Sequence, residues 1–526
     1  MLGYYLKNRR IAMGLTQDYV ASKLNVSRQA ISNWENGSRE IHFHDLIAYA
    51  KILEISFEDL EVHINKYENE KKHVSYTHSN HSLPNHLDLT IRRRKGDTKG
   101  KKYIKIEGDK VVGVHLLLSS LFFINKRLTV NNCPSALDFQ NVIDKFICQG
   151  WAKTSVHKDS VTIESFKYPF DISELNMVSR ASIGLISALT YKNHQLVFAF
   201  PGGDGFCYRP IDLHLDILST IASYKYDKIE KIYYSEKKDI LNKNISLNCY
   251  ADGCKSVGAF FNALSLAYVY PNEIVITGIS PDPTIYYLIE LLQKSTNRRI
   301  KYITADKIGI SKVDMIEIND AEITIPPDMS MLVSYVLLFW EELEDVIFEN
   351  ISIADIPENY INLFEKFGLK IYEMKQGISF KRESEISADY FEFLRLGALP
   401  FITTDLGPII SEFLAAHNIS SIMFDEVFIN RSTHISELEK LGINIQVLEN
   451  GAIKTVNRNE DSISEDVHFD LKDIRAGMAI IMGIKQSNIE KAILHNFDQV
   501  LRGFGNIRDI IDKLGYEVHE FEGANE

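Results

Sequence analysis

The sequence predicts an α/β protein of six repeats that fall into two groups of three, preceded by a small all-helical unit. Three observations carry this prediction. The 526 residues are too many for one small domain, since a domain usually holds about 100–200 residues. The first 66 residues have the pattern of short helices, and a helical pattern of apolar residues then recurs six times along the rest of the chain.

Composition and charge exclude several classes of protein. With 45% hydrophobic and 25% charged residues, the chain is not disordered as a whole. A net charge of −13 argues against coating nucleic acid or an anionic membrane, but not against one local DNA-reading module. The five cysteines form no CxxC pair, so neither a disulfide framework nor a zinc site is indicated. The apolar stretches 111–124 and 329–340 are shorter than the roughly 18–20 residues of a membrane span, so we expect a cytoplasmic protein without a membrane partner.

The first unit has the pattern of a helix-turn-helix. The segments 16–24 and 27–35 begin with Thr16 and Ser27, residue types that cap helices. In the second segment we expect Ala30, Ile31 and Trp34 to point inward. The outward side chains are then of the types that bind base edges and phosphates in the major groove. The predicted DNA-binding residues are Gln17, Ser27, Arg28, Gln29, Ser32 and Asn33.

The string GLTQDYVASKLNVSRQAISNWENGSRE closely resembles the Cro/repressor-type (Xre) helix-turn-helix family, over about the first 65 residues. The resemblance implies binding to duplex DNA, usually as a dimer, so a homodimer is one expected arrangement. A protein-interaction domain is the alternative, because the unit balances 8 basic against 8 acidic residues through Lys66. Residues 67–85 lack a hydrophobic period and are expected to form a linker.

The repeats are marked by apolar quartets spaced i, i+3, i+4, i+7, the spacing of one helix face. Their starting positions lie 71–75 residues apart, and strand-like runs precede and follow the later ones. We expect each quartet to be buried, and the break between the two groups to lie near Pro326. The alternative is an unrelated α/β protein with evenly spaced helices. The quartets start at Phe139, His214, Ile285, Tyr360, His434 and Ile507, of which the second and fifth are imperfect.

Six short motifs are spread over the chain after about residue 86. They are SRASIG (179–184), PGGDGFCYRPIDLHL (201–215), TTDLGP (403–408), FINRSTHISELEKLG (428–442), DIRAG (473–477) and RGFGNIRDIIDKLG (502–515). Together they resemble the UDP-N-acetylglucosamine enolpyruvyl transferases, which belong to one superfamily with EPSP synthase. The resemblance implies an inside-out α/β barrel of two three-repeat domains. We therefore expect a helix-turn-helix domain at 1–66, a linker at 67–85, one transferase domain at 86–110 plus 327–526, and the other at 111–326.

The resemblance also implies a reaction. The enolpyruvyl group of phosphoenolpyruvate moves to the 3′-hydroxyl of UDP-N-acetylglucosamine, a step of peptidoglycan precursor synthesis that needs no metal or cofactor. Both substrates are polyanions, so Lys and Arg are expected at fixed points. Motif matching implies catalytic roles for Lys110, Asp405, Arg475 and Arg502, with Asp405 accepting the hydroxyl proton. It implies substrate contacts for Arg180, Arg209, Pro210, Ile211, Asp212, Leu213, Asn430, Arg431 and Asp473. The alternatives are a helix cap for Asp405 and a surface salt bridge for any single arginine.

Three positions depart from the family pattern. Asp204 stands where most members carry a reactive cysteine, and a carboxylic acid of raised pKa can take over its role as catalytic proton donor. Val111 replaces an asparagine after Lys110, and Met329 replaces an arginine. Two hypotheses remain. The chain is an active transferase with a DNA-binding head, or a transcription regulator whose degenerate transferase module senses a UDP-sugar without turnover.

Overall fold

The chain divides into two compact units, Met1–Asn85 and His86–Glu526. The computed structural model describes residues 6–7, 9–10, 13, 15–24, 26–35, 43–53, 55, 87–94, 100–202, 209–239, 243–251, 254–398, 401–428, 431–449, 451–459, 466–487 and 489–522. Among these residues, we find no helix with the length and apolar character that a membrane crossing requires.

In the part of the first unit that the structure describes, a small apolar core lies among the helices α2 (Gln17–Leu24), α3 (Arg28–Glu35) and α4 (Phe43–Ile52). Both predicted capping residues cap. Thr16 Oγ1 accepts a hydrogen bond from the Tyr19 amide, and Ser27 Oγ accepts one from the Ala30 amide, each at 3.1 Å. Ile31 and Trp34 are buried as expected, whereas Ala30 is only partly buried.

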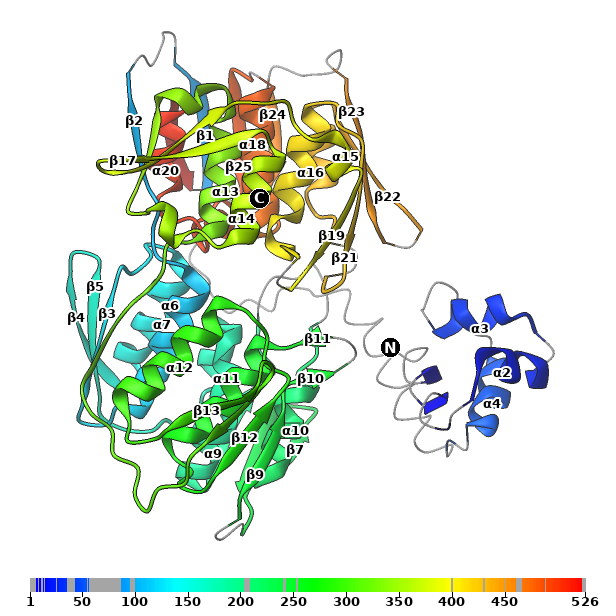
Figure 1. The fold of residues 1–526 in the computed structure, drawn as a ribbon, viewed down its shortest axis with the longest axis vertical. Coiled ribbons are helices and arrows are strands. Elements are labelled where there is room, and N and C mark those ends of the chain that lie inside the picture. Colours follow the sequence, from blue (N-terminus) through cyan, green and yellow to red (C-terminus); the bar gives the residue numbers. More distant parts are fainter. Residues whose placement is uncertain are drawn as a thin grey trace. The chain divides into compact units, whose positions relative to one another are not determined.

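The second unit has two hydrophobic cores, which define two lobes (Figure 1). Lobe A holds the core residues between 112 and 325, and lobe B those at 89–106 and 329–516. Two chain segments cross between the lobes and pair with one another. The Asp109 amide donates to the Pro326 carbonyl at 2.8 Å, and the Asp328 amide to the Glu107 carbonyl at 2.9 Å. The domain limits given above stay a prediction, but both crossings lie at this paired hinge.

Each lobe contains three copies of one repeat. In this repeat a central helix is followed by a strand, an outer helix and two more strands. In lobe A the copies are α6 (Lys110–Ser119), β3 (Arg127–Asn131), α7 (Leu137–Cys148), β4 (Ala152–His157) and β5 (Ser160–Ser165); α9 (Ile186–Asn193), β6 (Gln195–Ala199), α10 (Asp212–Ile221), β7 (Ala222–Asp227) and β8 (Ile232–Lys237); and α11 (Val257–Ser265), β12 (Ile274–Thr277), α12 (Pro283–Ser295), β13 (Ile300–Thr304) and β14 (Lys307–Ile310).

In lobe B the copies are α13 (Met329–Leu338), β16 (Val346–Glu349), α14 (Glu358–Lys366), β17 (Leu369–Met374) and β18 (Gly377–Arg382); α16 (Gly407–Ala416), β21 (Ser421–Asp425), α17 (Ile435–Glu439), β22 (Ile443–Val447) and β23 (Ile453–Arg458); and α18 (Ile474–Gln486), β25 (Lys491–His495), α20 (Ile507–Lys513) and β26 (Tyr516–Glu522). The third strand of the last copy is β1 (Leu87–Arg93), which lies at the start of the second unit of the chain. It pairs antiparallel with both β25 and β26.

Each copy has its own sheet, and most sheets gain a strand from outside the copy. The strand orders are β15-β3-β5-β4, β6-β8-β7, β13-β14-β12-β9, β17-β18-β16-β2, β20-β19-β21-β23-β22 and β24-β25-β1-β26. The remaining elements are β2 (Lys102–Lys105), β9 (Ile245–Asn248), β10 (Tyr250–Ala251), β11 (Cys254–Lys255), β15 (Ala321–Thr324), β19 (Phe393–Gly397), β20 (Ile402–Thr403), β24 (Asp466–Asp470), α8 (Ser173–Val178), α15 (Ala388–Phe391), α19 (Asp498–Leu501) and short 3-10 turns.

All six quartets lie on or directly beside the outer helices, and every one of their side chains is buried. This confirms the predicted repeat, including the two imperfect quartets, whose polar members His214, His434 and Glu437 are buried as well. The central helices α6, α11, α13, α16 and α18 are buried around most of their circumference, as expected of helices that are apolar on all sides. The starts of four of them carry the polar residues of the candidate site.

Candidate active site

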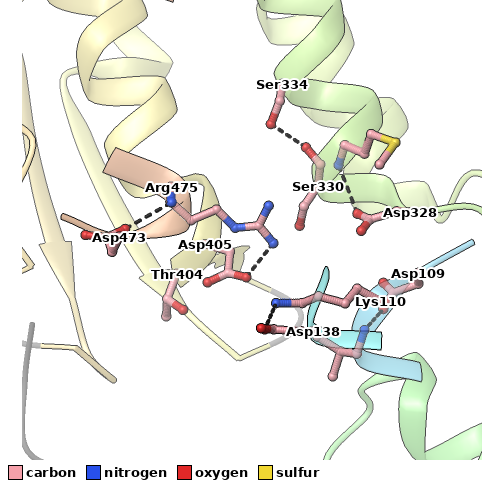
Figure 2. Close-up of polar contacts among 12 residues, drawn as sticks. Asp109, Lys110, Asp138, Asp328, Ser330, Ser334, Thr404, Asp405, Asp473 and Arg475 are labelled. Atoms are coloured by element: carbon pink, nitrogen blue, oxygen red, sulfur yellow. Dashed lines mark hydrogen bonds and ion pairs between the residues drawn. The ribbon is translucent and has the colours of Figure 1, made fainter. Parts of the chain in front are cut away.

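Asp405 lies in the 3-10 turn Thr404–Leu406, directly before α16. Its carboxylate accepts hydrogen bonds from two arginines of lobe B. Arg475 Nη2 lies 2.8 Å from Oδ2 (Figure 2), and Arg431 Nη1 lies 3.0 Å from Oδ1. The carboxylate caps neither the turn nor α16, which was the alternative role left open by the sequence. Both of its oxygens are instead bound to cations.

These pairings set the charge of the site. Burial alone would raise the pKa of Asp405, but the charges and hydrogen bonds of Arg475 and Arg431 outweigh it and hold that pKa well below its usual range. Burial also opposes the charge of Arg475, yet the neighbouring Asp405 keeps the pKa of this guanidinium above its usual value. The site therefore holds an ionised carboxylate between two ionised arginines.

Asp473 caps the helix that carries Arg475. Its Oδ1 accepts the backbone amides of Arg475 and Ala476, each at 2.9 Å, and so caps the start of α18. Its other oxygen accepts the Thr433 hydroxyl, and Arg431 Nη2 lies 3.8 Å from Oδ1. Asp473 is fully buried. It therefore holds the backbone of Arg475 in place and lies close to the Arg431 guanidinium.

A second cluster joins the two lobes. Lys110 is the first residue of α6 in lobe A, and Arg502 follows α19 in lobe B. Both bind Asp138, which lies in the first turn of α7, with Lys110 Nζ 3.1 Å from Oδ2 and Arg502 Nε 2.9 Å from Oδ1. Burial would raise the pKa of Asp138, but these two cations outweigh it and lower that pKa. The structure thus brings together two predicted cations that are 392 positions apart in the printed sequence.

Two further carboxylates lie at the hinge. Asp109 caps α6 by accepting the amides of Val111 at 2.8 Å and Val112 at 3.0 Å, and Asp328 caps α13 by accepting the Met331 amide at 2.9 Å (Figure 2). Burial and the negative charge of Asp328 raise the pKa of Asp109 to about 7. Sequence reasoning missed Asp109, Asp138 and Asp328. The sequence shows each of them only as an aspartate at the start of a helix, a pattern that also fits an ordinary helix cap. Their place beside the candidate site becomes visible only when the two lobes are assembled.

The predicted substrate-contact residues between 180 and 213 lie on lobe A. The Arg180 guanidinium donates to the carbonyls of Arg209 and Pro210. Ile211 is buried, Leu213 is partly buried, and Asp212 opens α10. The Arg209 guanidinium lies 5.9 Å from the ring centre of Phe428 in lobe B, and the Arg431 guanidinium faces the same ring at 5.6 Å. The Phe428 ring therefore lies between two arginines of different lobes. Arg209 of lobe A contacts Arg180, and Arg431 of lobe B binds Asp405.

Several predicted residues are not placed. Asp204 and Asn430 lie outside the described residues, as do the side chains of Gln29 and Asn33 in the first unit. In that unit, Arg28 is exposed, and its Nε lies 3.8 Å from Asp18 Oδ2. Ser27 caps α3, and Ser32 is partly buried. Gln17 Nε2 donates to Glu35 Oε2 at 2.8 Å, so this side chain is bound within the unit. Across the described parts of both units, no three His, Cys, Asp or Glu side chains gather in a way that could hold a metal ion.

Comparisons with known proteins cover both units. Residues 95–511 match the family model EPSP synthase (3-phosphoshikimate 1-carboxyvinyltransferase), and residues 6–60 match the family model Helix-turn-helix. Among curated relatives, UDP-N-acetylglucosamine 1-carboxyvinyltransferase 2 of Lactiplantibacillus plantarum is 25% identical over 74% of this chain and 86% of its own length. UDP-N-acetylglucosamine 1-carboxyvinyltransferase 1 of Caldanaerobacter subterraneus is 26% identical over 80% of this chain and 96% of its own length.

Solved structures share the fold. The enolpyruvyl transferase NikO from Streptomyces tendae matches with a TM-score of 0.67 and 14% identity, over 84% of this chain and 100% of that one. An EPSP synthase from Acinetobacter baumannii matches with a TM-score of 0.57 and 16% identity, over 83% of this chain and 100% of that one. These likenesses confirm the predicted fold class. With the match over 95–511, they show that the chain belongs to the EPSP synthase (3-phosphoshikimate 1-carboxyvinyltransferase) family and carries an N-terminal helix-turn-helix domain.

Proposed function

We propose that the second unit transfers the enolpyruvyl group of phosphoenolpyruvate to the 3′-hydroxyl of UDP-N-acetylglucosamine. The observation that carries the proposal is Asp405, an ionised carboxylate bound by Arg475 and Arg431 at the start of a central helix. A carboxylate of this kind can accept the hydroxyl proton, and arginines beside it can bind a carboxylate or phosphate bidentately. The names of the curated relatives support this choice of substrates.

The reaction asks little covalent chemistry of the protein. The sugar hydroxyl oxygen bonds to C2 of phosphoenolpyruvate while its proton passes to Asp405 and C3 gains a proton, which gives a tetrahedral ketal. Phosphate then leaves from C2 as C3 loses a proton, and the enol ether remains. Asp204 is the proposed donor to C3, by its place in the sequence motif. Lys110 and Arg502 are proposed to bind phosphoenolpyruvate, because one carboxylate, that of Asp138, holds both cations together where the two lobes meet.

The resting pairings give substrate binding a chemical consequence. Asp405 is a weak base while two arginines hold it, since a base works best when its pKa lies near the working pH. An incoming anion that binds Arg475 or Arg431 competes with Asp405 for the guanidinium. This competition raises the pKa of Asp405 when the hydroxyl is in place. The substrate thereby prepares the base that it needs.

A sensor without turnover is the second candidate, and Val111 favours it. This side chain is 40% exposed at the start of α6, next to Lys110, where an apolar group can bind no substrate hydroxyl. Under this alternative the second unit binds a UDP-sugar but the reaction does not follow.

We further propose that the helix-turn-helix domain binds duplex DNA through α3. Arg28 supports this, because its side chain is 67% exposed in the first turn of α3, the helix that a helix-turn-helix places in the major groove. Gln17 is proposed to support DNA binding indirectly, since its side-chain amide is bound to Glu35 within the domain.

One assay separates the transferase from the sensor. The full-length protein is mixed with phosphoenolpyruvate and UDP-N-acetylglucosamine, and released phosphate and the enolpyruvyl sugar are both measured. The proposal expects equal amounts of the two products. Binding of UDP-N-acetylglucosamine without either product would replace the transferase with the sensor.

A further inference from the structure

We propose that Asp138 is a positioning residue of the transferase site, which holds Lys110 of lobe A beside Arg502 of lobe B. The inference rests on the proposed function and adds a residue that neither the motifs nor the comparisons assign. Asp138 lies in no motif quoted for the family resemblance, and it directly precedes the first residue of the Phe139 quartet.

The geometry gives each oxygen of Asp138 its own partner. Oδ2 accepts Lys110 Nζ at 3.1 Å and Oδ1 accepts Arg502 Nε at 2.9 Å. The side chains are mostly shielded from water, with exposed fractions of 14% for Lys110, 17% for Asp138 and 21% for Arg502. Arg502 is held from a second side as well, since its Nη1 donates to Gln499 Oε1 at 3.0 Å.

Charge explains why an acid is needed at this point. Lys110 and Arg502 are like charges separated only by the width of one carboxylate, and their side chains are largely shielded from the water that would screen their repulsion. An anion between them removes the repulsion, so that both cations can face one substrate. Asparagine has the same shape, but it offers one acceptor oxygen and turns an NH2 group toward the second cation.

The backbone around Asp138 brings the lobes together at the same place. Gly505, three residues after Arg502, lies so close to lobe A that a Cβ there would collide with the backbone of Ser135. Ser135 is itself fixed to the hinge, because its amide donates to Glu107 Oε2 at 2.9 Å and its hydroxyl binds the same carboxylate. Asp138 therefore joins two segments that already lie against each other, and it sets the direction of their charged side chains.

The test compares four variants of the full-length protein. Asp138→Asn and Asp138→Ser remove the charge, Asp138→Glu restores it, and Asp144→Asn removes an exposed carboxylate from the same helix. Three quantities are measured: kcat and KM for phosphoenolpyruvate in the phosphate-release assay, the dissociation constant for UDP-N-acetylglucosamine by calorimetry, and backbone hydrogen exchange of the peptides around 135–140 and 499–507.

We expect the neutral variants to lose about 10²-fold in kcat/KM for phosphoenolpyruvate, the scale of a misplaced binding group. Their affinity for UDP-N-acetylglucosamine should stay within about twofold of the wild type, since the two cations that Asp138 binds are those assigned to phosphoenolpyruvate. Asp138→Glu should have about a tenth or more of the wild-type kcat/KM, because it keeps the bridging charge. Hydrogen exchange at 499–507 should accelerate in the neutral variants and not in Asp144→Asn. Asp138→Ser carries the test if Asp138→Asn does not fold.

Two results would overturn the positioning role. One is a neutral variant with wild-type kcat/KM, and the other is a loss that Asp138→Glu does not recover while UDP-sugar affinity falls in parallel, which is the pattern of a merely structural residue. A wild-type protein without turnover would contradict the proposed function instead. In that case the hydrogen exchange of 499–507 still decides the role of Asp138, which fails if exchange is unchanged.

Discussion

The Arg475 guanidinium and the Asp405 carboxylate lie 2.8 Å apart at the starts of two adjacent central helices, α18 and α16. Each group therefore offsets part of the charge of the other before any substrate binds. Arg431 binds the other oxygen of Asp405. The candidate base and its arginines thus form one electrostatic unit, and each variant of this unit has a definite expected effect.

Asp405→Asn should abolish turnover, because the amide keeps the shape of the side chain but cannot accept the hydroxyl proton. Binding of UDP-N-acetylglucosamine should survive, since the change removes one proton acceptor and no positive charge. The measurements are phosphate release and calorimetric titration, with the exposed Asp144→Asn as the control. Wild-type turnover in Asp405→Asn would remove this residue from the mechanism.

Arg431→Gln should shift the acid limb of the pH–rate profile to higher pH. The Arg431 charge is one of the interactions that hold the pKa of Asp405 low, so its loss lets that pKa rise. The profile of kcat reports this change in the enzyme–substrate complex, where the proposed competition with a substrate anion has already raised that pKa. Arg395→Gln is the matched control in the same lobe, because Arg395 is exposed and pairs with Glu426 instead. An acid limb that does not move would show that Arg431 does not control the base.

Asp109→Asn should remove a pH dependence of stability. A carboxyl whose folded pKa is about 7, against a usual 3.8, binds its proton more tightly in the folded state than in the unfolded state. Its contribution to stability is therefore complete below the unfolded pKa and is lost as the pH rises through the folded one. Thermal unfolding of the wild type and the variant at several pH values between these limits tests this. Parallel curves would contradict the raised pKa.

Phe364→Ala should destabilise lobe B by about 3–5 kcal/mol, the usual cost of emptying a fully buried aromatic site. Phe364 is completely buried in the α14 quartet and packs 4.7 Å, centre to centre, from the Phe380 ring of the neighbouring sheet. Glu365→Ala, an exposed neighbour on the same helix, is the control for denaturant unfolding. Equal denaturant midpoints for the two variants would contradict the assignment of the quartet to the core.

Arg28→Ala should weaken DNA binding by about 1–3 kcal/mol if α3 enters the major groove. Lys51→Ala removes the same charge from an exposed position on α4 and should matter far less. Genomic selection with the full-length protein provides the binding site, and titration at several salt concentrations compares the variants. Equal losses for both variants would mean that only net charge matters.

The repeated architecture could be predicted from the sequence because each quartet follows the period of a helix. Even Glu437 and His434 fit, since a helix face fixes their burial whatever their polarity. Asp405 and Arg475 stand out in the sequence because each lies within a continuous motif, and the structure brings the two side chains together.

Contacts between distant segments could not be predicted in the same way. Asp138 and Arg502 meet only after two lobes have formed, 364 positions apart in the chain. Gln17 is predicted to contact DNA from its residue type, and the sequence gives no sign that its Nε2 also donates to Glu35 within its own unit. Glu35 is a buried charge that needs several partners, and it receives Arg10 as well as Gln17. In both cases the decisive interaction depends on folding, not on local pattern.

The central claim is that this chain is an enolpyruvyl transferase, and phosphate release by the wild-type protein tests it most directly. With phosphoenolpyruvate and UDP-N-acetylglucosamine together, we expect one phosphate for each enolpyruvyl sugar formed, and none when either substrate is omitted. Phosphate release no faster than that of Asp405→Asn, from a protein that still binds UDP-N-acetylglucosamine, would contradict the claim.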